Sequence, residues 1–399
     1  MRFDDISTRD LTLAAIRRAL CELVVHFPVY RTYSRSCGRS EQDQQFFTQA
    51  LNGARTTLAE ADWPLLEHLD RWLGGQHLHE LPPGPVRKQR QKTLARFQQL
   101  TSPTAAKAVE DTACYRSATL LSRNDVGFDP QHFSAPLAQF HDQCKIRAAE
   151  FPDNMLTTAT HDHKRGEDTR ARIAVISERS VWFAEKVQSW RAQANALRTE
   201  LADGVAPSAG DELMLYQTLL GSWPLDLDIG ERRKHNDQNA ALQTYFDRIW
   251  RWQEKALREA KLRTSWSAPN AAYETACKEF LTKLLLGDEG LALRTDIAIA
   301  AFSLAPAGAL NGLSQTLLRM TAPGLPDLYQ GNEGKYTGSP ISLRRVRCLE
   351  WGKQRKRSNE DARTGIRYRN SGTDRGSTGW QPRAGKRTRT PDVPIDAAR

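Results

Sequence analysis

Apolar residues recur at spacings of three and four along several long segments before residue 333, a pattern typical of amphipathic helices. In the first segment Pro28 ends a face made of Leu13, Ile16, Leu20, Leu23 and Phe27. Similar stripes follow within residues 41–100, from Phe183 to Leu201 and from Tyr245 to Leu262. The pattern therefore predicts a predominantly helical chain.

Glycine and proline interrupt the helical pattern of residues 41–100. Gly74-Gly75 and the stretch from Pro82 to Pro85 are interpreted as loop corners. His77 and His79 lie beside this break with the spacing of two metal ligands. Zinc needs three or four ligands and no third one is near in the sequence, so a surface loop is favoured over a zinc site.

Two short segments break the helical pattern in another way. Residues 155–160 are compatible with a strand and lead into His161-Asp162 and a charged loop that continues to Arg172. Residues 325–329 fit a second buried strand that ends in a polar loop. Because function gathers at the carboxyl ends of strands in barrel and open α/β enzymes, the first loop is a candidate catalytic loop. An ordinary solvated loop is the alternative.

A net charge of +10 is typical of proteins that bind nucleic acid, but the location of the positive charge along this sequence argues against that function. Residues 341–399 hold 16 Lys/Arg and 6 Asp/Glu, whereas residues 1–340 hold 41 of each kind. A formally neutral body has no excess charge with which to hold a phosphate backbone, so no nucleic-acid partner is expected for it. The last residues lose apolar periodicity and predict a disordered basic tail.

The sequence contains no unbroken run of about 18 apolar residues, and its charged first ten residues lack the apolar stretch of a signal peptide. We therefore expect a cytoplasmic protein with no membrane partner. The six cysteines are scattered without a C-x-x-C pair, which favours reduced thiols over disulfides or a cysteine zinc site.

Six blocks in order resemble maltooligosyl trehalose synthases, a family of the α-amylase superfamily (glycoside hydrolase family 13). They span roughly residues 8–333 and are specific as a set. The blocks are Phe27 to Tyr33; Lys107 with Val109 to Thr112 and Tyr115-Arg116; Thr160-His-Asp162 with Lys164-Arg165; Glu212 to Trp223; Thr264-Ser-Trp266; and Pro323 to Gly331.

The resemblance implies an α/β fold, an incomplete (β/α)8 TIM barrel of the α-amylase type with large helical insertions. Residues 1–100 are then a helical insertion region, and residues 101–165 a barrel segment that ends at the His-Asp loop. Residues 166–300 are a second helical insertion, and residues 301–333 the last barrel helix and strand. The expected disordered basic tail, 334–399, is unrelated to the family, and either a reading-frame shift or a truncated gene model would produce such a junction.

The resemblance also implies a reaction. The family isomerises the reducing-end α-1,4 linkage of a maltooligosaccharide to α,α-1,1, giving a terminal trehalose unit with no cofactor. The superfamily reaction is a retaining double displacement that uses a carboxylate nucleophile and a carboxylic acid. The expected partner is accordingly a maltooligosaccharide or glucan.

Residue roles follow from the matched positions. Asp162 is the third carboxylate, which binds sugar hydroxyls and favours the distorted ring, and His161 donates to a neighbouring hydroxyl. Lys164 and Arg165 position the departing reducing-end glucose. Tyr329 and Gln330 belong to the segment that matches the eighth barrel strand, and they line the pocket wall. His161-Asp162-His163 also has metal-ligand spacing, but His163 stands where the family usually has Thr, and no metal is expected.

Nothing in residues 1–150 resembles the segments that carry the family's nucleophilic Asp and acid/base Glu, and the resemblance stops after Glu333. The chain therefore resembles a part truncated at both ends, and alone it is expected to be inactive. Two alternatives stay open. One is another α-amylase-type glucan hydrolase, and the other is a non-catalytic helical carbohydrate-binding remnant whose basic tail contacts nucleic acid.

Overall fold

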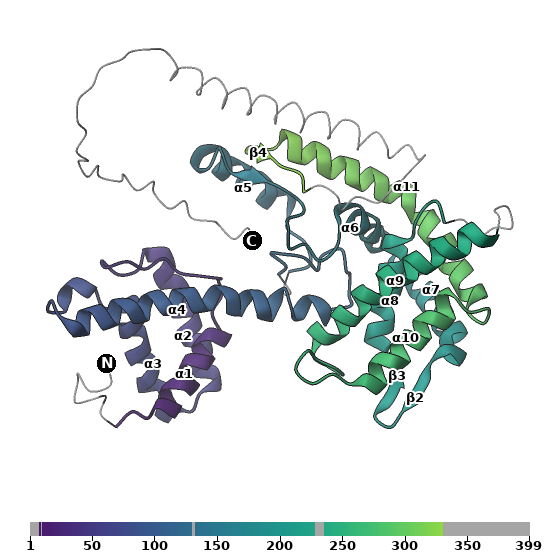
Figure 1. The fold of residues 1–399 in the computed structure, drawn as a ribbon. Helices are drawn as coiled ribbons and strands as arrows, with labels where there is room; N and C mark the ends of the chain where they lie inside the picture. Colours follow the sequence, from purple (N-terminus) through teal and green to yellow (C-terminus); the bar gives the residue numbers. More distant parts are fainter. Residues whose placement is uncertain (1–7, 9, 130–131, 228–234, 330–399) are drawn as a thin grey trace, which may run out of the picture. The chain divides into compact units, whose positions relative to one another are not determined.

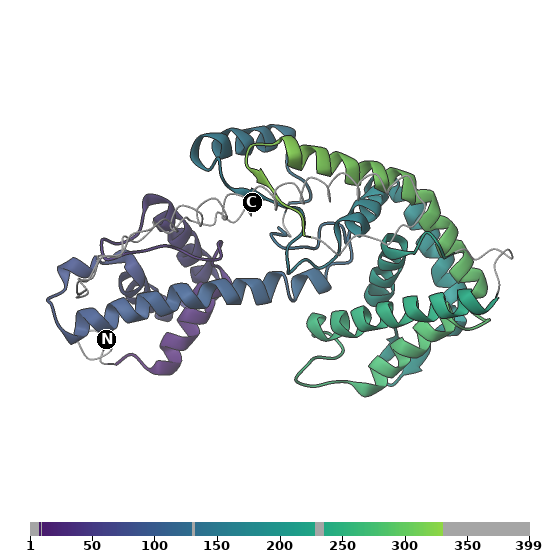
Figure 2. The same ribbon diagram turned by 45° about the horizontal axis from the view of Figure 1, so that its top comes forward.

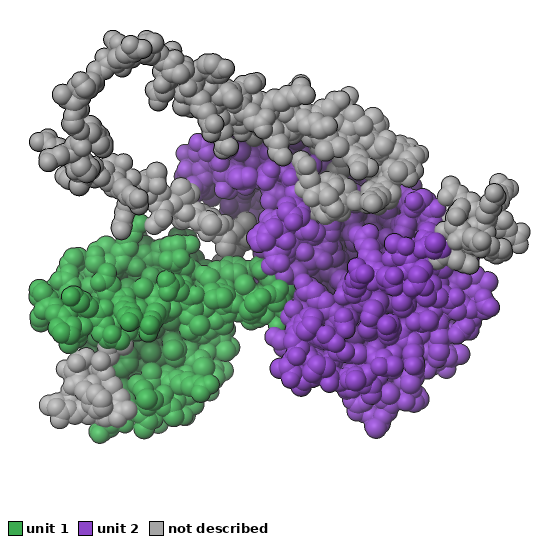
Figure 3. Space-filling model, in the orientation of Figure 1, with its two compact units in different colours: residues 1–113, 397–399 green, residues 114–396 purple. Residues whose placement is uncertain are grey.

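The computed structural model describes residues 8, 10–129, 132–227 and 235–329, which form two compact units divided between Ala113 and Cys114 (Figure 3). The expected basic tail and Gln330 lie outside the described residues. The boundary predicted at residue 100 falls inside a continuous helix, whereas the division into compact units comes 13 residues later. The predicted functional segments themselves stay a prediction.

The described residues of the first unit form four α-helices, joined by short turns: α1 (Leu13–Val25), α2 (Glu41–Thr57), α3 (Trp63–Asp70) and α4 (Pro85–Val109). As predicted, the first helix ends before Pro28, and its buried face includes Ala19 and Leu23, whereas Leu13 is exposed. The core of this unit joins Phe27, Phe47 and Phe97, with Phe27 in edge contact with the other two rings at 5.7 and 5.5 Å.

The predicted loop corner at Gly74-Gly75 contains a residue that needs glycine. Gly74 has φ +117°, and a Cβ there would lie 3.0 Å from the Ser34 hydroxyl oxygen. Beyond it, His79 lies in a short turn with its Nδ1 2.9 Å from Arg87. Among the described residues, no group of three His, Cys, Asp or Glu side chains is arranged to hold a metal ion.

The second unit is also mostly helical (Figure 1). Its elements are α5 (Leu137–Glu150), β1 (Met155–Leu156), α6 (Glu167–Ala174), α7 (Ser180–Gln193), β2 (Thr199–Leu201), β3 (Gly204–Ala206), α8 (Ala209–Ser222), α9 (His235–Ala260), α10 (Ala271–Leu285), α11 (Leu291–Thr321) and β4 (Leu325–Pro326). The long helix predicted from Phe183 to Leu201 therefore ends at Gln193. Its last residues instead pair as β2 with β3 in an antiparallel hairpin.

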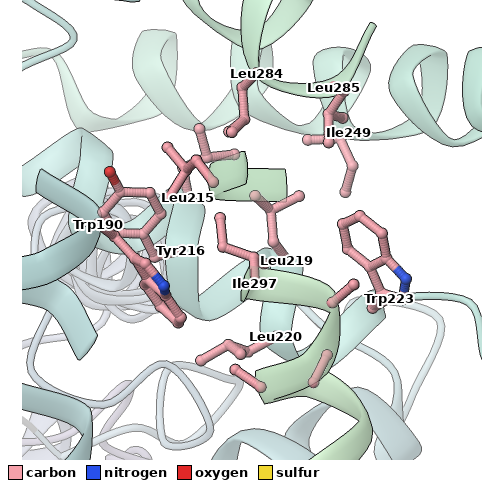
Figure 4. Packing of buried hydrophobic residues seen from close by; sticks show 14 of the residues in the cluster. Trp190, Leu215, Tyr216, Leu219, Leu220, Trp223, Ile249, Leu284, Leu285 and Ile297 are labelled. Carbon is pink, nitrogen blue, oxygen red and sulfur yellow. The ribbon is translucent and has the colours of Figure 1, made fainter. Parts of the chain in front are cut away.

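Helix α8 lies at the centre of the second unit. Ser208 caps its amino terminus, and its residues Leu215, Tyr216, Leu219 and Leu220 are fully buried (Figure 4). A helix that is apolar on most sides is stable only when neighbours surround it, and α6, α9 and α11 contact it here. Trp190 of α7 packs edge-on against Tyr216 at 5.3 Å. This packing fixes the helices that carry the candidate site.

The expected barrel is not seen among the described residues. The parallel strands that the structure describes are β1 and β4, which pair Met155 with Leu325 and Leu156 with Pro326. A closed barrel needs eight strands, and here helices fill almost all of the chain between the two. The described part of the chain is therefore predominantly helical, as expected, with one short parallel pair.

The prediction that no segment is apolar enough to span a membrane needs correction for helix α11. By length and composition it is the one described helix that meets the requirement for a span. An unbroken apolar run was too strict a criterion, because Ser303, Pro306 and Asn311 interrupt a stretch without charges. Its first half nevertheless packs Ile297 and Leu304 into the core cluster, as a core helix does.

Candidate functional site

The pairing of β1 with β4 places two sequence-predicted segments side by side. Leu325 N–H donates to Asn154 O at 2.8 Å, and Asp327 N–H donates to Leu156 O at 2.7 Å. Gly324 makes this approach possible, because its φ is +121° and a Cβ would lie 2.7 Å from Asn154 O. The loops that follow both strands therefore start from the same edge of the pair.

The loop after β1 is held by its own threonine. The Thr160 hydroxyl accepts from Asp162 N–H at 2.9 Å, and the Thr160 carbonyl lies 2.7 Å from the His163 Nδ1. The His163 ring also contacts the ring of Tyr329, with centroids 5.5 Å apart. Side chains of the loop and of the segment after β4 thus meet at His163, while His161 and Asp162 stay exposed.

Asp162 and Lys164 form a charge pair with unequal exposure. The Lys164 Nζ lies 3.6 Å from the Asp162 Oδ2, and the side chain of Lys164 is 2% exposed while that of Asp162 is 61% exposed. The buried ammonium is thus adjacent to a carboxylate side chain that is largely exposed to solvent. An exposed carboxylate with a fixed backbone has acceptor capacity for hydroxyl groups of a ligand.

Arg165 is the most unusual group of the loop. It is buried, and none of its three guanidinium nitrogens has a hydrogen-bond partner among the described residues. Burial lowers the pKa of this guanidinium to about 10, against the opposing effect of Tyr115 and Asp125, so it stays charged at neutral pH. Its central carbon lies 5.5 Å from the ring centroid of Trp252. A buried charge with donors left over is costly unless something accepts from it.

A buried ion pair anchors the base of this loop. Arg319 of α11 donates to the Glu167 carboxylate at 2.7 Å and to the Thr158 hydroxyl at 3.0 Å. The hydroxyl of Thr158 also donates to Glu167, and Arg170 donates to the Thr158 carbonyl. Both members of the Arg319–Glu167 pair are nearly inaccessible to solvent. The segment between β1 and α6 is therefore tied to the end of α11.

Sequence reasoning missed this anchor. Glu167 stands inside the charged run from His161 to Arg172, where nothing separates a structural charge from a functional one. Arg319 ends an apolar helix, and a cation there is ordinary because it complements the helix dipole. Nothing in the local sequence around either residue indicates its partner, which lies 152 positions away.

The structure thus brings together five of the six predicted site residues in two groups. His161, Asp162, Lys164 and Arg165 share one loop, and Tyr329 reaches that loop through the ring of His163. Their roles in binding or chemistry stay predictions. The alternative of a metal at His161-Asp162-His163 has no support in the described residues, where no metal-binding group of three is found.

Comparisons with known proteins give a consistent result at partial coverage. No family model matches the chain. A Mycobacterium tuberculosis protein named "Putative maltooligosyl trehalose synthase" is 37% identical over 238 residues, which are 60% of this chain and 28% of that protein.

Solved structures agree. The maltooligosyltrehalose synthase of Arthrobacter ramosus has 29% identity and a TM-score of 0.59, covering 79% of this chain and 35% of that one. A hypothetical maltooligosyl trehalose synthase of Sulfolobus tokodaii has 25% identity and a TM-score of 0.57, covering 78% of this chain and 36% of that one. The chain therefore spans about a third of the length of the relatives it matches.

Proposed function

This chain is homologous to maltooligosyl trehalose synthases over part of their length, and we propose that it forms one wall of the active site of such an enzyme. The proposed reaction is an intramolecular transglycosylation. The reducing-end α-1,4 linkage of a maltooligosaccharide is broken, and the released glucose is rejoined to the same chain through an α,α-1,1 linkage. A cytoplasmic location and a glucan substrate belong to the same proposal.

In this proposal β1 and β4 are the seventh and eighth strands of a (β/α)8 barrel. Their parallel pairing across a mostly helical connection supports it, because neighbouring barrel strands are parallel and joined by helices. The His161-Asp162 loop and Tyr329 then follow the carboxyl ends of consecutive strands, where the active sites of such barrels lie. This pairing is the observation that carries the proposal.

Asp162 acts as a substrate-binding carboxylate rather than as nucleophile or acid. Its exposed oxygens accept from two adjacent sugar hydroxyls, and these charge-assisted bonds strengthen as the ring flattens towards the oxocarbenium-like transition state. His161 donates to a neighbouring hydroxyl of the same sugar. Lys164 orients the Asp162 carboxylate through the 3.6 Å contact.

Arg165 binds the glucose that leaves and returns. Its unpartnered guanidinium supplies donors in a buried setting, and sugar hydroxyl oxygens are suitable acceptors for them. Holding the free glucose while it reorients is what separates transfer from hydrolysis, because water otherwise attacks the glycosyl-enzyme intermediate. Tyr329 and Gln330 line the same side of the pocket in this proposal.

The nucleophile and the acid/base are not among the residues that resemble the family, so this chain alone is proposed to be inactive. The test therefore joins the chain to the part of the Mycobacterium tuberculosis relative that it does not match. The joined protein is incubated with maltopentaose. We expect loss of reducing ends without release of glucose, because a terminal trehalose unit has no free anomeric hydroxyl.

A matched pair of variants tests the role of Asp162. Asp162→Asn should lower kcat at least about 100-fold, as the loss of transition-state hydrogen bonds does elsewhere. Asp153→Asn makes the same change at an exposed carboxylate at the other end of β1 and should leave kcat unchanged. Release of glucose or maltose would assign an α-amylase-type hydrolase instead. Binding of maltopentaose without any product would favour a non-catalytic carbohydrate-binding protein.

A further inference from the structure

The sequence block Thr264-Ser-Trp266 has no role in the proposed function. It lies in the loop that joins α9 to α10, two helices that contact each other, and the loop projects from one end of this pair (Figures 1 and 2). Thr264 is buried, whereas Trp266 is 54% exposed. Trp190 and Trp223 of the same unit are instead fully buried in its core. The block therefore presents an indole to solvent.

A hydrogen-bond network fixes the loop on both sides of this indole. The buried Thr264 hydroxyl donates to the Glu274 carboxylate of α10 at 2.6 Å. The Ser265 hydroxyl accepts from Ala268 N–H at 3.0 Å, which closes a turn across Trp266. The indole is thus exposed on a backbone that specific partners hold in place.

Arg258 of α9 restrains the ring itself. Its guanidinium lies over the Trp266 ring, with the central carbon 4.8 Å from the ring centroid. Each carboxylate oxygen of Glu274 accepts from this guanidinium at 2.8 Å, and Glu254 lies 3.0 Å from it. A guanidinium bound by two carboxylates is a fixed support for the ring. It covers one face of the indole while more than half of the side chain stays exposed.

The residues that flank Trp266 in the loop are mainly polar. Lys261, Arg263 and Ser267 are exposed, and Leu262 is an exposed apolar neighbour. A single apolar plane with hydroxyl and cationic groups beside it differs from the large apolar core of a protein interface. It suits a pyranose ring, which has an apolar face of C–H bonds and a rim of hydroxyl groups that donate and accept hydrogen bonds. A ring that is already fixed also loses little conformational entropy on binding.

We propose that Trp266, supported by Arg258, is a glucan-binding platform on which one pyranose ring of an α-1,4-linked glucan stacks. Lys261 and Ser267 are placed to bind hydroxyl groups at the rim of that sugar. The choice of glucan as the ligand rests on the proposed function, whereas the stacking rests on the geometry of the loop. Trp266 takes no part in the reaction, so its effect is on affinity.

The experiment titrates the full chain with maltopentaose in an isothermal titration calorimeter. Trp266→Ala should weaken binding about 3- to 10-fold, the range of one aromatic stacking contact. Trp266→Phe keeps a smaller ring and should weaken binding less, which separates loss of the platform from loss of the fold. Trp63→Ala is the matched control, because Trp63 of α3 is also exposed, at 36%, and should leave binding unchanged.

The proposal is overturned if the full chain does not bind maltopentaose, if Trp266→Ala binds it as tightly as wild type, or if Trp63→Ala weakens binding equally. It is also overturned if Asp162→Asn removes all of the binding, or if Trp266→Ala dissociates a homodimer in analytical ultracentrifugation instead. The proposed function fails on a different readout, the products of the joined protein. Binding that depends on Trp266 without any transfer would therefore leave the platform in place.

Discussion

The unpartnered guanidinium of Arg165 makes a prediction in which binding and stability move in opposite directions. Burial lowers the pKa of this guanidinium from its ordinary value to about 10, so folding destabilises the charged form by about 3 kcal/mol. Arg165→Met removes that charge and fills a similar volume. We expect the variant to be more stable by about 1–3 kcal/mol, because apolar replacement of buried charges is often stabilising, and to lose affinity for maltooligosaccharides.

The assay is urea unfolding followed by tryptophan fluorescence, with glucan binding measured in parallel. Arg172→Met is the matched control, because Arg172 is equally buried but donates to the Trp223 carbonyl at 2.9 Å. That variant leaves the acceptor unsatisfied and should lose about 1–3 kcal/mol. If Arg165→Met is more stable than wild type while Arg172→Met is less stable, the result supports the view that the unpartnered charge of Arg165 serves ligand binding.

The pH dependence follows from the same shift. The unfolded chain binds the proton of Arg165 more tightly than the folded chain, so the penalty is fully present below about pH 10 and is relieved as pH rises through that value. The stability difference between Arg165→Met and wild type should therefore shrink above pH 10. The reasoning is refuted if Arg165→Met destabilises the chain as much as Arg172→Met does. The Arg165 guanidinium would then stabilise the fold through interactions as strong as those of Arg172.

Three further outcomes are expected. Arg319→Ala removes the guanidinium that pairs with the buried Glu167 carboxylate and should cost about 3–5 kcal/mol in urea unfolding, with much of the loss recovered when Glu167→Gln is added. The hydrogen bond from Arg258 holds the pKa of Glu274 below its ordinary value, so the stabilisation from this pair is fully present above the ordinary pKa and is lost as pH falls through the lowered pKa. Glu274→Gln should flatten that part of the pH–stability curve. Gly308→Ala should lower the thermal midpoint through about 1–3 kcal/mol of overpacking, because its Cβ would lie 2.8 Å from a backbone atom of α6, and unchanged melting would contradict that contact.

The sequence pattern predicted the helices better than the contacts that matter for the site. Helix α1 was predictable because one apolar stripe ends at a proline, yet Leu13 in its first turn is exposed, which spacing alone does not reveal. The helix predicted to reach Leu201 ends early because Thr199 to Leu201 pair with a hairpin partner, a contact that helical periodicity cannot foresee.

The site was predictable in outline and not in its energetics. Resemblance selected Asp162 and Arg165, and the structure places them on one loop with opposite exposures. The burial of Arg165 could not be predicted from a charged run, because solvated and buried cations are the same residue types. The anchor of Glu167 by Arg319 depends on tertiary packing of segments 152 residues apart, and no local signal encodes it.

The pairing of Met155 with Leu325 also has a kinetic meaning. These residues are 170 positions apart, so their contact closes a very long loop. The entropy of closing so long a loop is repaid only after the intervening helices have condensed and brought the ends together. We therefore expect the β1–β4 pair to form late in folding and to open first in native-state exchange. Order in the His161-Asp162 loop would then report that the whole helical connection has folded.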